Sequence, residues 1–209
     1  MKNKIKSIIF FAFFIPLLSF SQSENFDSLL VEFDSVKKET IIDGEDRKVF
    51  DLLEDLYKET LQSNKGGISK KTIAKYIKLS ADTELKNKNI LFLFNTYQNY
   101  ISETLAAGKI TDPLYQQKIM NLLSFECISI YNQIPAIVFI YMGEALMNNK
   151  ESENAIQHFD LALGFYPSSI PMKIYKFLLD EENNKELKDE LIKKHSKHWM
   201  VKQNAINFL

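Results

Sequence analysis

The chain has only one cysteine, Cys127, among its 209 residues, so it cannot form an internal disulfide bond. Glycine and proline are also scarce, with six and five residues, and no segment of low complexity occurs. This composition is unlike that of disordered or collagen-like chains, which are rich in both residues. Side-chain packing, rather than covalent links, must therefore hold the fold together.

Neither sign of charge is in large excess, because 26 lysines and arginines face 27 aspartates and glutamates. A chain of this balance lacks the basic surface that attracts phosphate backbones, so we expect no nucleic-acid partner. No uninterrupted apolar run reaches the roughly 20 residues that a membrane-spanning helix needs. The sequence also has no glycine-rich phosphate-binding loop, and we expect no cofactor.

Residues 1–21 have the pattern of a secretory signal peptide. Three lysines precede an apolar run over 8–18, and Ser19 and Ser21 place small residues three and one positions before Gln22. The alternative, a membrane anchor, is disfavoured because the run has only eleven residues. We therefore expect cleavage before Gln22, export to the periplasm or out of a bacterial cell, and no stable membrane insertion afterwards.

The remaining 22–209 is predicted to be a single all-helical domain. Its 188 residues are enough to bury a core, and its 23 basic and 27 acidic side chains give a net charge of −4. Apolar residues recur at three- and four-residue steps, which is the period of a helix that packs on one side. The predicted helices span about 26–38, 49–61, 70–79, 89–107, 112–132, 135–147, 152–166, 169–179, 186–194 and 199–209. Gly66 and Gly67 predict a hinge.

The most informative stretch is the 34-residue unit 136–169. Small residues stand where two helices would cross closely, and a proline stands where the second helix must end. The positions that carry the pattern are Phe139, Met142, Gly143, Leu146, Ala155, Phe159, Ala162 and Pro167. This spacing resembles one tetratricopeptide repeat (TPR), a helical hairpin of a family that mostly binds other proteins.

The resemblance implies an all-α fold in which helical hairpins stack as a short, TPR-like right-handed array. Only this one repeat is recognisable. One unit earlier, Asn121 and Gln133 stand where the family has alanine and proline. The segments 89–107 and 112–132 are therefore either a degenerate repeat or a hairpin unrelated to the repeat.

In the TPR family the first helix of each hairpin lines a concave groove. This implies that Ile137, Ile140, Glu144 and Met147 face a protein or peptide partner. A family subset that clamps a partner's C-terminal carboxylate uses lysine and asparagine at such positions, so Ile140 and Glu144 disfavour that mode. A hydrophobic or basic partner segment fits better. The alternative is that these side chains only pack against helix 112–132.

The resemblance thus predicts a non-enzymatic protein-interaction module, a scaffold or adaptor. One rival is a carrier of a small ligand or peptide, with a pocket among Phe92, Tyr97, Tyr100 and Phe125. Another is a hydrolase built around Cys127 or His158, although no motif around either residue supports catalysis.

The remaining candidates for chemistry are few, and we expect no catalytic or metal site. His195 and His198 would share a face of one helix and could ligate a metal, but no third ligand follows from the spacing. They are expected on the surface. Trp199, Met200 and Phe208 either cap the array or form an exposed docking patch.

Overall fold

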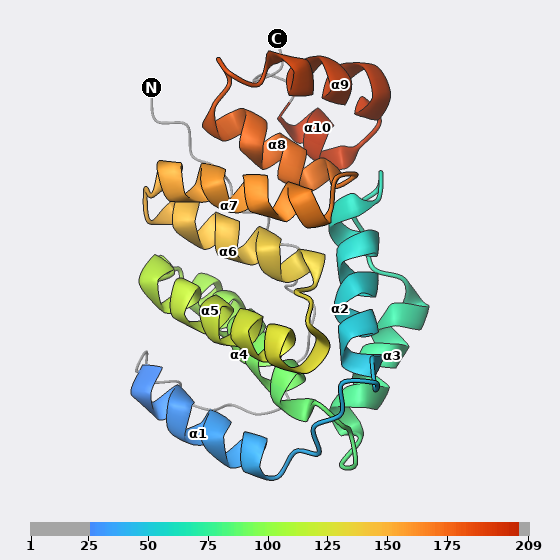
Figure 1. Cartoon of the computed structure of the whole chain (residues 1–209), viewed down its shortest axis with the longest axis vertical. Helices are drawn as coiled ribbons and strands as arrows, with labels where there is room; N and C mark the ends of the chain where they lie inside the picture. The colour runs from blue at the N-terminus through green and yellow to red at the C-terminus, as the bar shows by residue number, and fades with distance from the viewer. Residues whose placement is uncertain (1–25, 205–209) are drawn as a thin grey trace.

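The computed structural model describes residues 26–204, which form ten α-helices, one short π-helix and no strand (Figure 1). The helices are α1 (Phe26–Lys38), α2 (Lys48–Tyr57), α3 (Lys70–Ala81), α4 (Lys88–Ala106), α5 (Pro113–Tyr131), α6 (Ala136–Asn148), α7 (Ser152–Phe165), α8 (Ile170–Leu179), α9 (Lys185–His195) and α10 (Trp199–Gln203), with the π-helix η1 (Lys58–Gln62) directly after α2. The expected all-α fold is confirmed, with most bounds within two residues of prediction. The predicted signal peptide lies outside the described residues.

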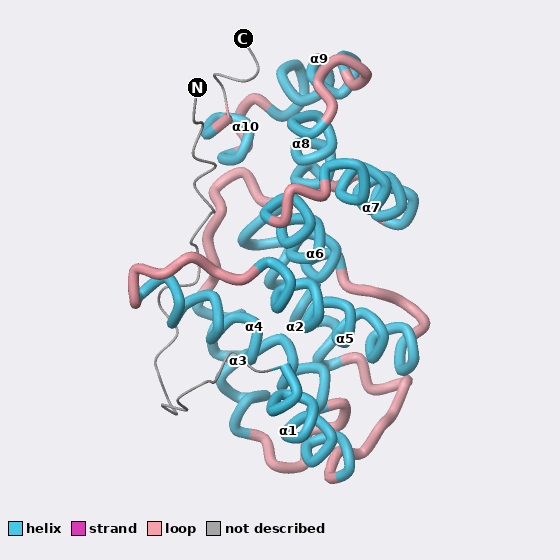
Figure 2. Tube along the Cα trace, turned by 90° about the vertical axis from the view of Figure 1, so that its left-hand side faces the viewer, coloured by secondary structure: helices cyan, strands magenta, loops and turns pink. Residues whose placement is uncertain are grey.

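Helices α4 to α9 stack as consecutive antiparallel pairs, α4 with α5, α6 with α7 and α8 with α9. Neighbouring pairs also pack on each other, through α5 with α6 and α7 with α8. We call α4, α6 and α8 the A helices, and α5, α7 and α9 the B helices. Helix α1 packs against α4, and α10 packs against α8 and α9 at the other end of the stack (Figures 1 and 2). No helix within 26–204 combines the length and the apolar character needed to cross a bilayer.

Most of the predicted helix ends are confirmed by their local geometry. The Asp112 carboxylate accepts a hydrogen bond from the Leu114 N–H ahead of Pro113, and Gly108 ends α4 with a φ of 67°. Helix α7 begins at Ser152, the predicted first residue, and the preceding Glu151 makes no capping bond.

The small residues of the repeat lie where the A and B helices of one hairpin cross. A Cβ atom added to Gly143 of α6 would lie 2.1 Å from Phe159 Cζ of α7, far inside van der Waals contact. Phe159 and Ala155 are both fully buried. The crossing of α6 and α7 therefore depends on the missing side chain at position 143, as predicted.

Helix α2 stands upright across one end of the stack, where the A helices begin (Figure 1). The Glu54 carboxylate accepts a hydrogen bond of 2.7 Å from the N–H of Ala136, the first residue of α6. Eight residues later, the Gln62 side-chain oxygen accepts one of 2.9 Å from the N–H of Ile170, the first residue of α8. Eight residues earlier, the Asp46 carbonyl accepts one of 2.9 Å from Asn87, which precedes α4. The segment 46–62 thus meets the start of three successive A helices.

The π-helix brings Gln62 into line with Glu54. An α-helix advances about 100° per residue, so eight α-helical steps would leave the two side chains about 80° apart. A π-helix, with its longer hydrogen-bonded ring, advances only about 80° per residue, and four such steps remove most of that offset. The irregular turn is therefore what allows one helix to cap both α6 and α8.

The predicted hinge at Gly66 is covered by the C-terminal helix α10. Gly66 has a φ of 61°, and a Cβ atom there would lie 2.7 Å from the Trp199 indole nitrogen. His198, just before α10, is fully buried, and its Nε2 lies 2.9 Å from the Leu61 carbonyl oxygen. Its expected surface position was therefore wrong, since α10 folds back onto η1 and the loop that follows it.

Candidate functional site

The A helices share one long face, and α2 covers the part of it nearest their N-termini. The predicted groove residues Ile137 and Ile140 lie in that part, on the first two turns of α6, and both are fully buried. They belong to the core and are not open to a partner in this structure. Glu144 and Met147, one and two turns further along α6, are half-buried. The part of the A-helix face that α2 does not cover therefore begins after Ile140, and we call it the open part.

A row of three tyrosines lies along this open part, two of them buried beneath its surface. The rings of Tyr97 on α4 and Tyr141 on α6 stack with centroids 5.1 Å apart. Tyr175 on α8 stacks on Phe159 at 5.3 Å. Tyr97 and Tyr175 are buried, and Tyr141 is half-buried. Each of three successive A helices thus contributes one tyrosine to the same face.

Glu144 lies among these tyrosines. Its Oε1 accepts a hydrogen bond from the Tyr175 hydroxyl, which ties α6 to α8. Burial raises the pKa of this carboxyl to about 7, and the Tyr175 hydroxyl only partly offsets the effect by stabilising the charged form. The nearby carboxylate in turn contributes to the raised pKa of Tyr97 and of Tyr141, although burial is the larger cause for both.

No ion pair of the described residues involves Glu144. The two lysines of the neighbouring helix α8 have other partners, because Lys173 pairs with Glu190 at 2.9 Å and Lys176 pairs with Asp160. Glu144 is therefore a carboxylate that is held by a hydroxyl and surrounded by aromatic rings, with no counter-charge assigned to it.

A polar hollow of about 420 Å³ opens beside α2, and four of the charged side chains that line it have structural partners. The guanidinium of Arg47, the only arginine of the chain, lies 3.9 Å from the centre of the Phe50 ring and donates to Gln133 Oε1. Glu54 caps α6, as described above. Lys75 and Asp55 form an ion pair of 2.6 Å. The hollow therefore reflects how α2 is fixed to α3 and to the start of α6.

The four aromatic residues predicted to line a ligand pocket lie in different surroundings. Tyr97 and Tyr100 are buried, with Tyr100 packed edge-on against Tyr115 at 4.7 Å. Phe92 is half-buried, whereas Phe125 on α5 is 64% exposed. These side chains do not enclose one common space.

The residues of the hydrolase alternative are both engaged in packing. Cys127 is fully buried, and burial raises the pKa of its thiol well above the usual range, which disfavours the nucleophilic thiolate. His158 Nε2 lies 2.8 Å from the Phe139 carbonyl oxygen and joins α7 to α6. Burial lowers the pKa of this imidazole. His158 therefore has an interhelical packing role.

The two remaining candidates concern the C-terminal segment. His198 is buried, and within 26–204 no three histidine, cysteine or acidic side chains are grouped to hold a metal. Met200 is buried and Trp199 is half-buried over Gly66, so these two act as part of a cap. Phe208, the third residue of the docking patch considered above, lies outside the described residues.

Comparison with known proteins gives no relative, since no family model, curated protein or solved structure matches the chain. The functional argument therefore rests on the geometry of the molecule itself.

Part of the tyrosine row carries a signal in the sequence that the search for motifs did not use. The pair Ile140-Tyr141 recurs 34 residues later as Ile174-Tyr175, one repeat length further along. That signal places Tyr175 at the equivalent position of the next A helix. Tyr97 carries no such signal, because it lies 44 residues before Tyr141, out of step with the repeat.

Proposed function

We propose that the chain is a TPR-like protein-interaction module that binds its partner along the open part of the A-helix face. The main support is the partly exposed surface of Tyr141, Glu144 and Met147 on α6, beside the buried Tyr97 and Tyr175 of the neighbouring A helices. A surface on a stack of helices suits an elongated protein segment better than a compact small molecule. The sequence pattern of 136–169 supports the TPR-like assignment independently.

The pattern of residues 1–21 extends the proposal to location. We infer that the module is exported and acts as a scaffold or adaptor in the periplasm or outside the cell. The described residues provide no converging set of catalytic groups, so binding is the activity that the geometry favours. The carrier alternative has less support, because its predicted aromatic residues do not surround a shared cavity.

A crosslinking pull-down tests this function. The bait is the tagged chain from Gln22 onward, which keeps every described residue, and the prey is the envelope fraction of the native cell. We expect a few reproducible partners, lost with Met147→Lys on the open face. The matched control Gln157→Lys, at an exposed position of α7, should keep them. A well-folded bait without partners would contradict the proposal and favour the carrier, to be tested by extracting bound small molecules.

A further inference from the structure

The open part of the A-helix face contains one charged group that its surroundings do not balance. Glu144 is half-buried on α6, and the only hydrogen bond assigned to its carboxylate comes from the Tyr175 hydroxyl. A carboxylate that leaves bulk water normally has a cation or several donors around it. For the Glu144 carboxylate, the described residues supply one hydrogen-bond donor, the Tyr175 hydroxyl, and no cation.

The groups facing Glu144 come from all three A helices and are aromatic. Tyr97, Tyr141 and Tyr175 are the titratable groups that interact with its charge. The faces of tyrosine rings carry negative potential and attract ammonium and guanidinium groups within about 6 Å of the ring centre. Of the three rings only that of Tyr141 is partly exposed, and this ring and the carboxylate favour the same kind of ligand.

Met147 and Tyr141 extend the same face on either side of Glu144 and are also half-buried. Their partly exposed apolar surface suits the methylene stem of a long basic side chain, since lysine and arginine bury their stems while the charged end seeks a polar partner. The site thus offers partly exposed apolar surface, an aromatic ring and a carboxylate.

We propose that the Glu144 carboxylate is the docking point for a lysine or arginine side chain of a partner protein. The cation would supply the missing counter-charge and lie beside the partly exposed Tyr141 ring, which would fix the register of the partner segment along α6. This inference rests on the proposed function and adds the chemical class of the partner segment, which is basic and amphipathic.

The test uses fluorescent 14-residue amphipathic helical peptides and the chain from Gln22 onward. One peptide contains leucine and lysine, and its match has every lysine replaced by glutamine. Fluorescence anisotropy should show that the wild-type chain binds the lysine peptide and hardly binds the glutamine peptide. The Glu144→Gln variant should bind the lysine peptide about tenfold more weakly, as expected for the loss of one charge-assisted hydrogen bond. Glutamine keeps the shape of Glu144 and an oxygen for Tyr175, so the variant should fold, which circular dichroism would verify.

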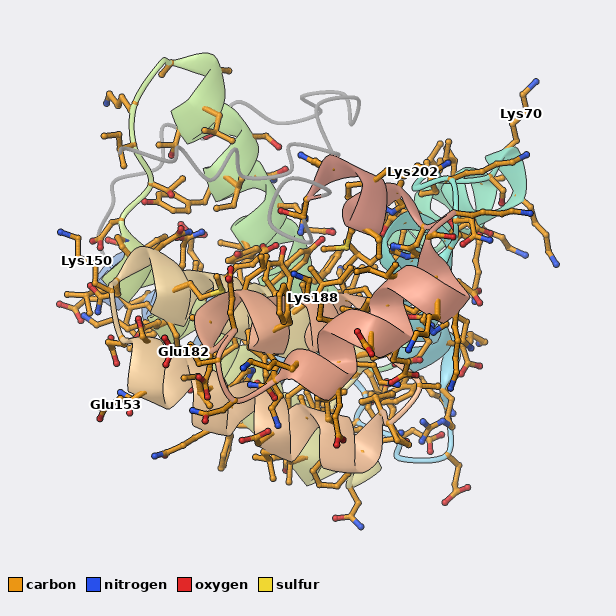
Figure 3. The ribbon with its side chains drawn as sticks, turned by 90° about the horizontal axis from the view of Figure 1, so that it is seen from above. Lys70, Lys150, Glu153, Glu182, Lys188 and Lys202 are labelled. Carbon is orange, nitrogen blue, oxygen red and sulfur yellow. The ribbon has the colours of Figure 1, made fainter. Side chains whose placement is uncertain are left out.

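Glu182→Gln is the matched control, because it removes the same charge from an exposed site. Glu182 lies between α8 and α9 and is exposed (labelled in Figure 3). It should leave the affinity for the lysine peptide within about twofold of wild type, since an exposed charge contributes little. Equal weakening by both variants would indicate general charge attraction and overturn the inference, as would unchanged binding by Glu144→Gln. Neither result would contradict the proposed interaction module, because the pull-down could still identify a partner that binds through other contacts.

Discussion

The carboxylate of Glu54, in the middle of α2, accepts a hydrogen bond of 2.7 Å from the N–H of Ala136, the first residue of α6. These residues are 82 positions apart in the chain. The bond satisfies the backbone N–H of Ala136, which has no partner within the helix. Pro135, just before α6, has no side-chain oxygen that could accept this hydrogen bond. It also places a negative charge at the positive end of the helix dipole. The helix that covers part of the A-helix face is therefore attached to the α6–α7 hairpin at the first residue of that hairpin.

Replacing Glu54 by alanine should lower the free energy of unfolding by about 1–2 kcal/mol, the usual cost of losing an N-cap. Chemical denaturation followed by circular dichroism measures the change. Asp51→Ala, one turn earlier on the exposed side of α2, should cost no more than about 0.5 kcal/mol. An equal loss in the two variants would argue against the capping role.

The π-helix η1 should tolerate a deletion better than an insertion. Removing Lys58, an exposed residue, would let an α-helix place Gln62 seven steps from Glu54, only about 20° out of line. Inserting an alanine after Lys58 would add a further step and turn Gln62 about 80–100° away from the start of α8. We expect the melting temperature of the insertion variant to fall clearly below that of the deletion variant. The reverse order would show that η1 does not set this register.

Gly143→Ala should destabilise the protein by about 1–3 kcal/mol, because the new methyl group collides with the Phe159 ring between α6 and α7. Gly164→Ala is the control, since nothing lies within 4 Å of a Cβ atom added at that helical position. It should be neutral or stabilise by up to about 1 kcal/mol through better helix propensity. Thermal unfolding of both variants measures these changes in stability, and an equal effect in the two would contradict the close crossing of α6 and α7.

Glu144 should make the protein less stable as the pH rises from about 4.5 to 7. Its pKa is raised to about 7 in the folded chain, so the folded state binds the proton more tightly than the unfolded state. The stability that this proton contributes is complete below the unfolded pKa of 4.5 and is lost as the pH passes 7. The total loss is at most about 3 kcal/mol, less if water reaches the half-buried carboxylate.

The difference in unfolding free energy between wild type and Glu144→Gln isolates this effect from the rest of the chain. Burial lowers the pKa of His158 and of His198, which makes their own contributions change in the opposite direction with pH. Both variants contain these histidines, so their contributions cancel in the difference. A difference that stays constant from pH 4.5 to 8 would contradict the raised pKa.

Much of the fold could be predicted because its signals are local. The stripes of apolar residues, the Asp112-Pro113 cap and the close contact of Gly143 with Phe159 each follow from residue type and spacing. The course of α2 could not be predicted in this way. Its six buried apolar residues say that it packs on several sides, but not that it lies against the starts of the A helices.

The site was predicted less well than the fold, for the same reason. Burial of Ile137 and Ile140 depends on α2, a helix about 80 residues away in the chain, whereas Glu144 and Met147 lie beyond its cover. The tyrosine row depends on three helices brought together by the stack. Only its Tyr141 and Tyr175 carry a sequence signal, the 34-residue interval between them.

The proposed binding face has a rival on the opposite, B-helix side of the hairpins. Leu161 and Phe165 on α7 are 58% and 65% exposed, so a partner has apolar surface to contact there as well. A measurement that distinguishes the two faces is therefore the most direct test of the account.

That measurement is photo-crosslinking in the native cell from a single benzoylphenylalanine, placed at Met147 on the A-helix face or at Leu161 on the B-helix face. The account predicts a discrete crosslinked partner from position 147 and none from position 161. A partner crosslinked only from position 161, or from neither position in a folded and exported chain, would contradict it.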